Sequence, residues 1–154
     1  MKRENTADAP LGTVAEHLSS EGPKNAGVVI FYGNTVALGK RIEVCPYTKK
    51  PPAFAGYWSP FCGAIEKGET PEEAAARELK EETGIEVETG RLNLMSQIRD
   101  LALFALDTKD LKMIELDYEH TEYGYFKVSQ LHNSPNPIDE ELVKLIQLYA
   151  FLNS

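Results

Sequence analysis

Residues 63–85 of this chain place a glycine-bounded loop directly before a helix that carries three carboxylates on one face. The stretch reads GAIEKGETPEEAAARELKEETGI. On a helix, Glu78, Glu81 and Glu82 fall within an arc of about 100°, because residues three and four apart are neighbours. Like charges so placed repel one another unless solvent or a cation neutralises them. The stretch therefore predicts a cation site of carboxylate oxygens, which suit Mg²⁺ or Mn²⁺.

The sequence marks both ends of this helix. Thr70 is a suitable N-cap, Pro71 stands at the first helical position, where its missing N–H costs nothing, and Glu73 completes a capping box. Gly84 stands where a left-handed residue would end the helix. We therefore predict a helix over residues 71–83. The small alanines beside the carboxylates predict that this side packs closely on a core.

Arg77 is placed to hold the carboxylates in fixed positions. It precedes Glu78 and lies four residues before Glu81, within reach of paired hydrogen bonds from a guanidinium. Glu69 lies just before the helix and is near enough to join the cluster. A solvated acidic helix is the alternative interpretation. That alternative does not explain the glycines at both ends or the Arg-Glu pair.

The spacing of these residues resembles the complete signature of the Nudix (MutT-like) hydrolase family, the Nudix box. The matching positions are Gly63, Glu69, Arg77, Glu78, Leu79, Glu81, Glu82, Gly84 and Ile85. The resemblance implies a hydrolase that cleaves the pyrophosphate bond of a nucleoside diphosphate linked to another moiety. In such enzymes a metal-activated water attacks one phosphorus, and the metal lowers the pKa of that water.

The same resemblance implies a site for Mg²⁺, with Mn²⁺ as a substitute. Its candidate ligands are the carbonyl of Gly63 and the side chains of Glu69, Glu78, Glu81, Glu82 and Glu119. Among them Glu78 and Glu82 would hold the essential ion, and Arg77 would orient Glu78. The catalytic base is Glu78, Glu81 or Glu119, and the sequence leaves the choice open.

An acidic segment further along the chain, residues 117–126, resembles the loop and strand that complete the site in many Nudix hydrolases. Glu119 is the first candidate there and Glu122 the second, while a solvent-facing loop is the alternative for both. His120 could assist a leaving group or bind a phosphate. A lone loop histidine is more often merely exposed, so we expect His120 to lie in solvent.

Four aromatic residues precede the box and suggest how a substrate is bound. Phe54, Tyr57, Trp58 and Phe61 could form a platform on which a nucleobase stacks, worth about 1–3 kcal/mol per base. We select Trp58 and Phe61 as the contacts, with ordinary core packing as the alternative. Arg41, late in a predicted strand, is a weak candidate for a phosphate contact.

Substrate identity stays open at this point. Nucleoside triphosphates, nucleotide sugars and dinucleoside polyphosphates all remain candidates. Members of the family commonly carry Pro-Gly-Gly where this chain has Phe61-Cys62-Gly63, so the backbone before the box is uncertain. A main-chain ligand at Gly63 tolerates such neighbours if the dihedral angles are kept.

Composition narrows the possible partners. The 154-residue chain carries 16 basic and 24 acidic residues, a net charge of −8, which argues against binding duplex nucleic acid. Bound metal ions would make the acidic site attractive to a phosphate substrate. Cys45 and Cys62 lack a CxxC spacing, so we expect reduced thiols in a cytoplasm. With no apolar run of signal or membrane-spanning length, we expect no membrane association. A homodimer is possible.

Hydrophobic patterning predicts an α/β fold. The expected strands cover residues 26–32, 35–44, 91–98, 101–107, 112–116 and 122–128. The first two are joined by a turn at Gly33-Asn34, a loop with three prolines covers residues 45–57, and residues 139–152 form an amphipathic helix. A mixed sheet with one helix on each face would bury both apolar stripes. The resemblance likewise implies the Nudix α/β/α sandwich.

We expect residues 25–154 to form a single Nudix hydrolase domain. Residues 1–24 are polar and rich in proline and glycine, with a weak helical stretch at Thr13 to Leu18, and are predicted to be a tail.

Two alternatives to a hydrolase stay open. One is a catalytically silent Nudix-fold module that binds or senses a nucleotide, although such modules typically lose box glutamates and all of them are present here. The other is a Nudix-like isomerase acting on an isoprenoid diphosphate, which would use a catalytic cysteine, with Cys62 as the candidate. The intact box and only three histidines argue against it.

Overall fold

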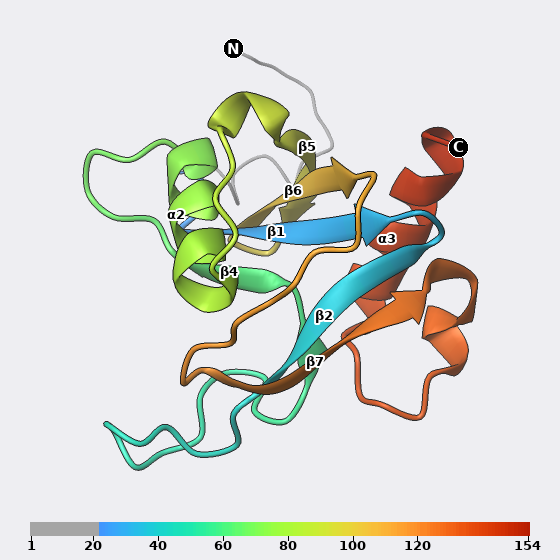
Figure 1. Ribbon diagram of the computed structural model, residues 1–154. Helices are drawn as coiled ribbons and strands as arrows, with labels where there is room; N and C mark the ends of the chain where they lie inside the picture. Colours follow the sequence, from blue (N-terminus) through green and yellow to red (C-terminus); the bar gives the residue numbers. More distant parts are fainter. Residues whose placement is uncertain (1–21) are drawn as a thin grey trace, which may run out of the picture.

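The computed structural model describes residues 22–154 and has a mixed β-sheet between two helices (Figure 1). This is the α/β/α arrangement that the sequence predicted. The strands are β1 (Asn25–Tyr32), β2 (Thr35–Arg41), β3 (Trp58–Ser59), β4 (Phe61–Ala64), β5 (Asn93–Ile98), β6 (Leu101–Thr108) and β7 (His120–Lys127). The helices are α2 (Pro71–Thr83) and α3 (Glu140–Leu152), with short 3₁₀ turns at Thr89–Arg91 and Val128–Asn133. The weak helix expected at residues 13–18 lies outside the described part.

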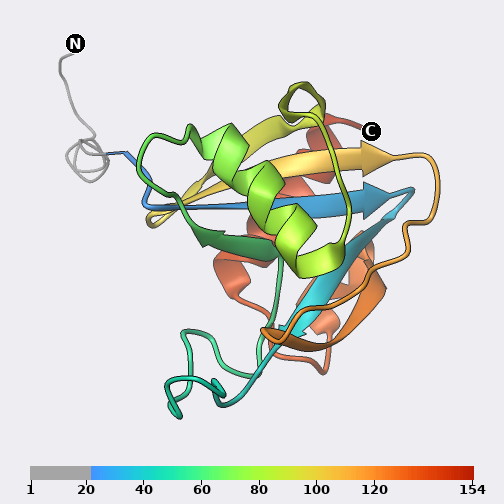
Figure 2. The same ribbon diagram turned by 60° about the vertical axis from the view of Figure 1, so that its left-hand side comes forward.

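Strand β1 is the centre of the sheet. It pairs along its whole length with β6, in parallel, and β5 continues the sheet beyond β6 in antiparallel fashion. On its other side, the first half of β1 pairs with β4 and the second half with β2. Strands β4 and β2 therefore diverge from a common partner, and β7 extends the sheet beyond β2 (Figure 2).

Alternation along β1 and β6 divides the core into two layers. Ala26, Val28 and Ile30 pack on the α2 side, and Val29 and Phe31 pack on the α3 side. The α2 helix contributes small buried residues to its layer, as the alanine-rich face predicted. The α3 helix contributes Leu142, Val143 and Ile146 to the other layer. Both apolar stripes are thus covered by opposite faces of one sheet.

The predicted ends of the α2 helix are confirmed. The Thr70 hydroxyl accepts from the N–H of Glu73 at 3.1 Å, and the Glu73 carboxylate accepts from the N–H of Thr70 at 3.0 Å. Gly84 ends the helix with φ of 80°, a left-handed conformation in which glycine is favoured. These local bonds fix the rotation of the helix, and with it the direction of its glutamates.

Several strand predictions need correction. Residues 112–116 form no strand: Ile114 is buried in the α2 layer, but the backbone N–H of Glu115 donates to the carbonyl of Thr83 rather than to a neighbouring strand. The second strand ends at Arg41 instead of residue 44. Strands β3 and β4 were missed because they are short and separated by Pro60, so neither shows a recognisable alternation.

Among the described residues, no helix is both long enough and apolar enough to cross a membrane.

Candidate metal and substrate site

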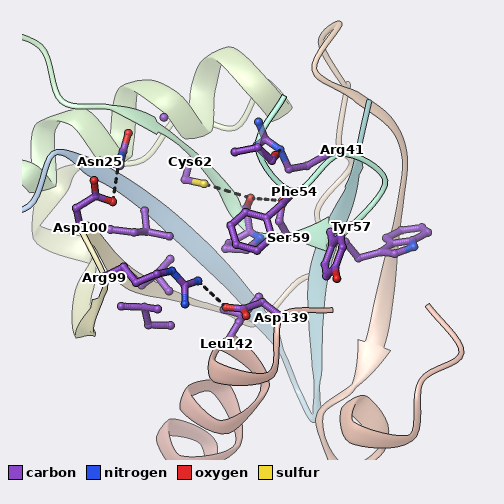
Figure 3. Close-up of a pocket in the computed structure, with 17 residues that line it drawn as sticks. Asn25, Arg41, Phe54, Tyr57, Ser59, Cys62, Arg99, Asp100, Asp139 and Leu142 are labelled. Carbon is purple, nitrogen blue, oxygen red and sulfur yellow. Dashed lines mark hydrogen bonds and ion pairs between the residues drawn. The ribbon is translucent and has the colours of Figure 1, made fainter. Parts of the chain in front are cut away.

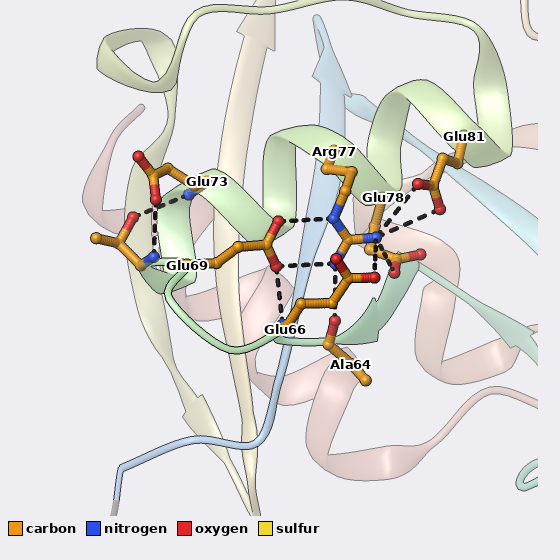
Figure 4. Close-up of polar contacts among 8 residues, drawn as sticks. Ala64, Glu66, Glu69, Glu73, Arg77, Glu78 and Glu81 are labelled. Carbon is orange, nitrogen blue, oxygen red and sulfur yellow. Dashed lines mark hydrogen bonds and ion pairs between the residues drawn. The ribbon is translucent and has the colours of Figure 1, made fainter.

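Arg77 is the centre of a hydrogen-bonded cluster on the α2 helix (Figure 4). Its Nε donates to Oε2 of Glu69 at 2.7 Å, and its Nη2 donates to Oε1 of Glu69 at 2.9 Å. Its Nη1 donates to Oε2 of Glu78 at 2.9 Å and lies 3.3 Å from Oε2 of Glu81, while Nη2 also donates to the carbonyl of Ala64 at 2.9 Å. One guanidinium therefore connects three of the predicted glutamates with strand β4.

These contacts also set the charge of Glu69. Hydrogen bonds from Arg77 first, and then from the backbone N–H of Glu66, lower the pKa of Glu69 to about 2. Glu69 is thus an ionised anchor for the guanidinium at neutral pH. Both oxygens of Glu69 accept hydrogen bonds from Arg77, so the main role of Glu69 in this structure is to orient the guanidinium.

Gly63 is required by the position of Glu78. A Cβ atom added at Gly63 would overlap the carboxylate of Glu78. Strand β4 and the α2 helix therefore approach so closely that only glycine leaves room for the carboxylate. Strands β1 and β4 also approach closely at Gly27, where an added Cβ would overlap the Cys62 side chain. The Phe61-Cys62 pair is thus accommodated in a regular strand, which removes the uncertainty about this backbone.

Glu82 is the most unusual side chain of the cluster. It is fully buried, and neither of its carboxylate oxygens has a hydrogen-bond partner. Burial, followed by the neighbouring carboxylates of Glu78 and Glu119, raises the pKa of Glu82. An unpaired buried carboxylate is costly, so a protein that keeps one has a use for it or supplies a cation.

His120 is buried beside Glu82, contrary to the expectation that it lies in solvent. The side chain, from the first residue of β7, has its Nε2 3.9 Å from Oε1 of Glu82 and its Nδ1 3.6 Å from Oδ1 of Asp117. Its ring meets that of Phe61 at a centroid distance of 5.2 Å. Burial, followed by the charge of Arg41, lowers the pKa of His120.

The two acidic candidates near β7 separate in the structure. Glu119 is half-buried in the loop before the strand, where burial and then Asp117 raise its pKa. Glu122 is exposed and pairs across the sheet with Lys40. The pairing of β7 with β2 shifts by one residue between Lys40 and Arg41. The regular alternation of side chains along β7 is therefore interrupted between Glu119 and Glu122. Glu119 is therefore near the cluster, whereas Glu122 lies exposed on β7.

A cavity of about 260 Å³ lies beside β4, on the side of α3 (Figure 3). Cys62 and Gly63 form part of its wall, and Arg41 reaches it from the end of β2. Most of the remaining lining is apolar: Trp58, Pro60, Leu101, Leu103 and Leu142. Because Gly63 also contacts Glu78, one strand connects this cavity with the carboxylate cluster.

The mouth of the cavity is formed by charged and aromatic side chains. Arg99 donates to Asp139 at 2.8 Å and to Glu141 at 2.6 Å, and its guanidinium lies 5.5 Å from the centroid of the Phe54 ring. The rings of Phe54 and Tyr57 meet edge to face at 5.5 Å, and both remain partly exposed. Arg99 lies in the tight turn between β5 and β6, where its backbone has a φ of 54°.

The predicted stacking contacts are corrected in part. Phe61 is fully buried in the α2 layer and has no free face for a ligand. Trp58 lines the cavity, but only 7% of it is exposed, and its ring meets Phe126 edge to face. The exposed aromatic faces belong instead to Phe54 and Tyr57. Sequence reasoning missed Arg99 and Asp139, because no local pattern indicated that a turn and a helix start would meet.

Cys62 is a poor candidate for a nucleophile. Burial, followed by the charge of Glu82, raises its pKa to about 12, so the thiol stays neutral at physiological pH. The thiolate is the reactive form of cysteine. The geometry therefore gives no support to the isomerase alternative.

The carboxylates were tested for their fit to a divalent cation. No group of three or more His, Cys, Asp or Glu side chains within residues 22–154 stands in an arrangement ready to hold a metal ion. Arg77 donates to oxygens of Glu69, Glu78 and Glu81. The unpartnered oxygens of Glu82, next to Glu78, are nevertheless hard donors of the kind that Mg²⁺ or Mn²⁺ prefers. The donor set therefore fits such an ion.

Comparison with known proteins agrees with this geometry. The NUDIX domain profile matches residues 22–149, most of the chain. The MutT protein from Methanosarcina mazei Go1 has a TM-score of 0.67 and 21% identity, with 88% of this chain and 99% of that chain covered. The E. coli dihydroneopterin triphosphate pyrophosphohydrolase has a TM-score of 0.63 and 20% identity, with 86% and 99% covered. For a C. elegans Ap4A hydrolase the values are 0.61, 20%, 85% and 98%.

A shorter match links the chain to an octanoyltransferase from Myxococcus xanthus. The two are 49% identical over 39 residues, which is 25% of this chain. The matched segment is 11% of the octanoyltransferase, so the chain spans only a small part of that curated relative. At their low identities, the three solved structures establish a shared fold.

Proposed function

This chain belongs to the NUDIX domain family, and from that premise we propose that it is a Mg²⁺-dependent hydrolase of nucleoside diphosphates linked to another moiety. The observation that carries the proposal is the buried Glu82, whose two oxygens lack partners beside Glu78. Bound Mg²⁺ or Mn²⁺ would supply an attacking water of lowered pKa and positive charge opposite the phosphates. Glu78 and Glu82 would hold this ion, with Gly63, Glu81 and Glu69 as further ligands.

The other residues of the site bind, orient and accept a proton. Arg77 fixes the carboxylate of Glu78 through Nη1 and is itself fixed by Glu69. Glu119, half-buried and with a raised pKa, is the first candidate for the base that accepts the proton of the attacking water. Glu78 and Glu81 remain alternatives. Arg41 is the candidate phosphate contact, since its side chain reaches the cavity.

The cavity beside β4 is the proposed site for the nucleoside. Its mostly apolar wall suits a ring system, and the exposed face of Phe54 offers a stacking surface. Trp58 forms part of the wall. Asp139 at the mouth can accept hydrogen bonds from amino or imino groups of a base. Glu122, exposed on β7, is the second acidic candidate for a substrate contact.

Cavity size favours one substrate class. About 260 Å³ is below the range of roughly 300–1,000 Å³ typical of sites that enclose drug-sized ligands. There is room for one nucleoside, so nucleoside triphosphates are the first candidates. The second half of a nucleotide sugar or dinucleoside polyphosphate would lie outside the cavity. The names of two structural neighbours do not choose between the classes, since one names a triphosphate, dihydroneopterin triphosphate, and the other names Ap4A, a dinucleoside polyphosphate.

A substrate panel tests the proposal. Nucleoside triphosphates, nucleotide sugars and dinucleoside polyphosphates are incubated with the protein and Mg²⁺, and the nucleotide products are separated and measured by chromatography. We expect turnover of at least one nucleoside triphosphate, lost when EDTA is added. No turnover of any compound, with nucleotides still raising the melting temperature, would contradict the proposal and favour a silent nucleotide-binding module.

We also propose that the enzyme works in the cytoplasm and forms a homodimer.

Replacement of Phe54 by alanine tests the stacking surface. We expect the KM for the best substrate to rise about tenfold, within the 1–3 kcal/mol that base stacking contributes, while kcat changes little. Tyr47→Ala is the matched control, because Tyr47 is an exposed aromatic residue in the same loop that packs on Tyr118 instead. Equal KM values for the wild type and Phe54→Ala would remove Phe54 from the binding site.

A further inference from the structure

We propose that His120 is a positioning residue for Glu82, with the N–H of its Nε2 directed at one carboxylate oxygen of the metal-binding pair. The inference rests on the proposed function, since it concerns the same carboxylates. It assigns a role to a histidine outside the Nudix box.

The first observation is where the unsatisfied atoms lie. Within residues 22–154, the buried side-chain nitrogens and oxygens without a hydrogen-bond partner are the two oxygens of Glu82 and the two nitrogens of His120. These four atoms belong to neighbouring side chains, with Nε2 of His120 3.9 Å from Oε1 of Glu82. Buried polar groups are otherwise almost always paired. The two side chains are therefore each other's available partners.

The second observation is that the surroundings of His120 are shaped to hold its ring. A Cβ at Gly39 would lie 2.8 Å from Cδ2 of His120 and 2.8 Å from Cε1 of Phe61, so only glycine fits there. Phe61 closes another side with an edge-to-face ring contact at a centroid distance of 5.2 Å. Two elements of the sheet thus confine the imidazole to one position beside Glu82.

The third observation is that Asp117 stands at the opposite end of the ring. Its Oδ1 lies 3.6 Å from Nδ1 of His120 and accepts a hydrogen bond from the N–H of Glu119 at 3.1 Å. A neutral imidazole carries a single N–H, so donation to Glu82 from Nε2 requires the tautomer in which Nδ1 is unprotonated and makes no hydrogen bond to Asp117. Asp117 therefore closes the far end of the ring's surroundings and connects them with the loop that holds the candidate base.

The register shift in β7 explains how the histidine reaches this position. His120 pairs with Arg41 and Glu122 pairs with Lys40, so one extra residue, Thr121, lies between two consecutive β2 partners. Such a bulge re-aims the side chain before it. Without it, His120 and Glu122 would share a face, whereas Glu122 is exposed and His120 is buried.

Binding of Mn²⁺ alone tests the inference without relying on turnover. Mn²⁺ affinity is measured by electron paramagnetic resonance of the free ion for the wild type, His120→Phe and His120→Gln. We expect His120→Phe, which keeps the ring but not the nitrogens, to weaken binding about 10- to 100-fold, as expected for loss of an outer partner of a metal ligand. His120→Gln restores an N–H donor and should recover most of the affinity. His132→Gln is the matched control and should bind as the wild type does.

Each outcome has a distinct meaning. Wild-type affinity in His120→Phe, or equally weak binding in the folded Phe and Gln variants, would overturn the positioning role. If His120→Phe does not fold, His120→Leu replaces it, and we expect the same loss of affinity in the folded variant; no loss would overturn the inference. Failure of the wild type to bind Mn²⁺ would instead overturn the proposed function, and the two failures are thereby distinguished.

Discussion

Glu82→Gln should reduce hydrolysis by about 10³-fold or more while leaving the protein folded. The amide keeps the shape of the buried side chain but loses the charge that would hold the metal. A bound ion contributes several kcal/mol of transition-state stabilisation, and each 1.36 kcal/mol is a factor of ten in rate. The measurement is kcat/KM with Mg²⁺ on the best substrate of the panel.

The same variant should separate metal binding from stability. Both oxygens of Glu82 are buried without partners, so a neutral amide is no harder to bury, and we expect Glu82→Gln to melt at or above the wild-type temperature without metal. Metal at 100 times its Kd should stabilise the wild type by about 2.7 kcal/mol and the variant by nothing measurable. Glu72→Gln, an exposed change on the same helix, is the control. Retained turnover in Glu82→Gln would contradict the metal role of Glu82.

The parts of this protein that could be predicted are those set by local chemistry. The α2 helix begins and ends where its capping box and Gly84 place it, because those bonds join residues that are close in sequence. Successive side chains of β1 and β6 point to opposite faces of the sheet, and this order also depends only on neighbouring residues. The contact of Arg77 with Glu81 follows from helical spacing, while the bonds to Glu78 and Glu69 join an adjacent residue and the loop just before the helix.

The parts that could not be predicted depend on distant contacts. Residues 112–116 were expected to form a strand, yet this segment pairs with no strand and buries Ile114 in the α2 layer. His120 is buried because a bulge, visible only in the pairing of β7 with β2, re-aims it. The pairing of Arg99 with Asp139 joins a turn and a helix start 40 residues apart. A single sequence carries no local signal of such contacts.

Arg77 is central enough that even a conservative change should be costly. Lysine keeps the charge but cannot reproduce the fork that contacts both oxygens of Glu69, Glu78 and the carbonyl of Ala64. Hydrogen bonds to charged groups contribute about 1.5–3 kcal/mol when well formed. Because Arg77 and Glu69 are partly exposed, we expect Arg77→Lys to lower the free energy of unfolding by only about 1–3 kcal/mol, measured by urea denaturation.

Activity should fall further than stability in Arg77→Lys. Glu78 would lose the donor that fixes its rotamer, and loss of such an outer partner typically costs 10- to 100-fold in metal affinity or turnover. Raising the concentration of Mg²⁺ should therefore restore part of the lost kcat. Arg91→Lys is the control, since Arg91 makes one long contact, 3.4 Å to the carbonyl of Asp107. If Arg77→Lys is as stable and active as Arg91→Lys, charge alone suffices at this position and the guanidinium does not orient Glu78.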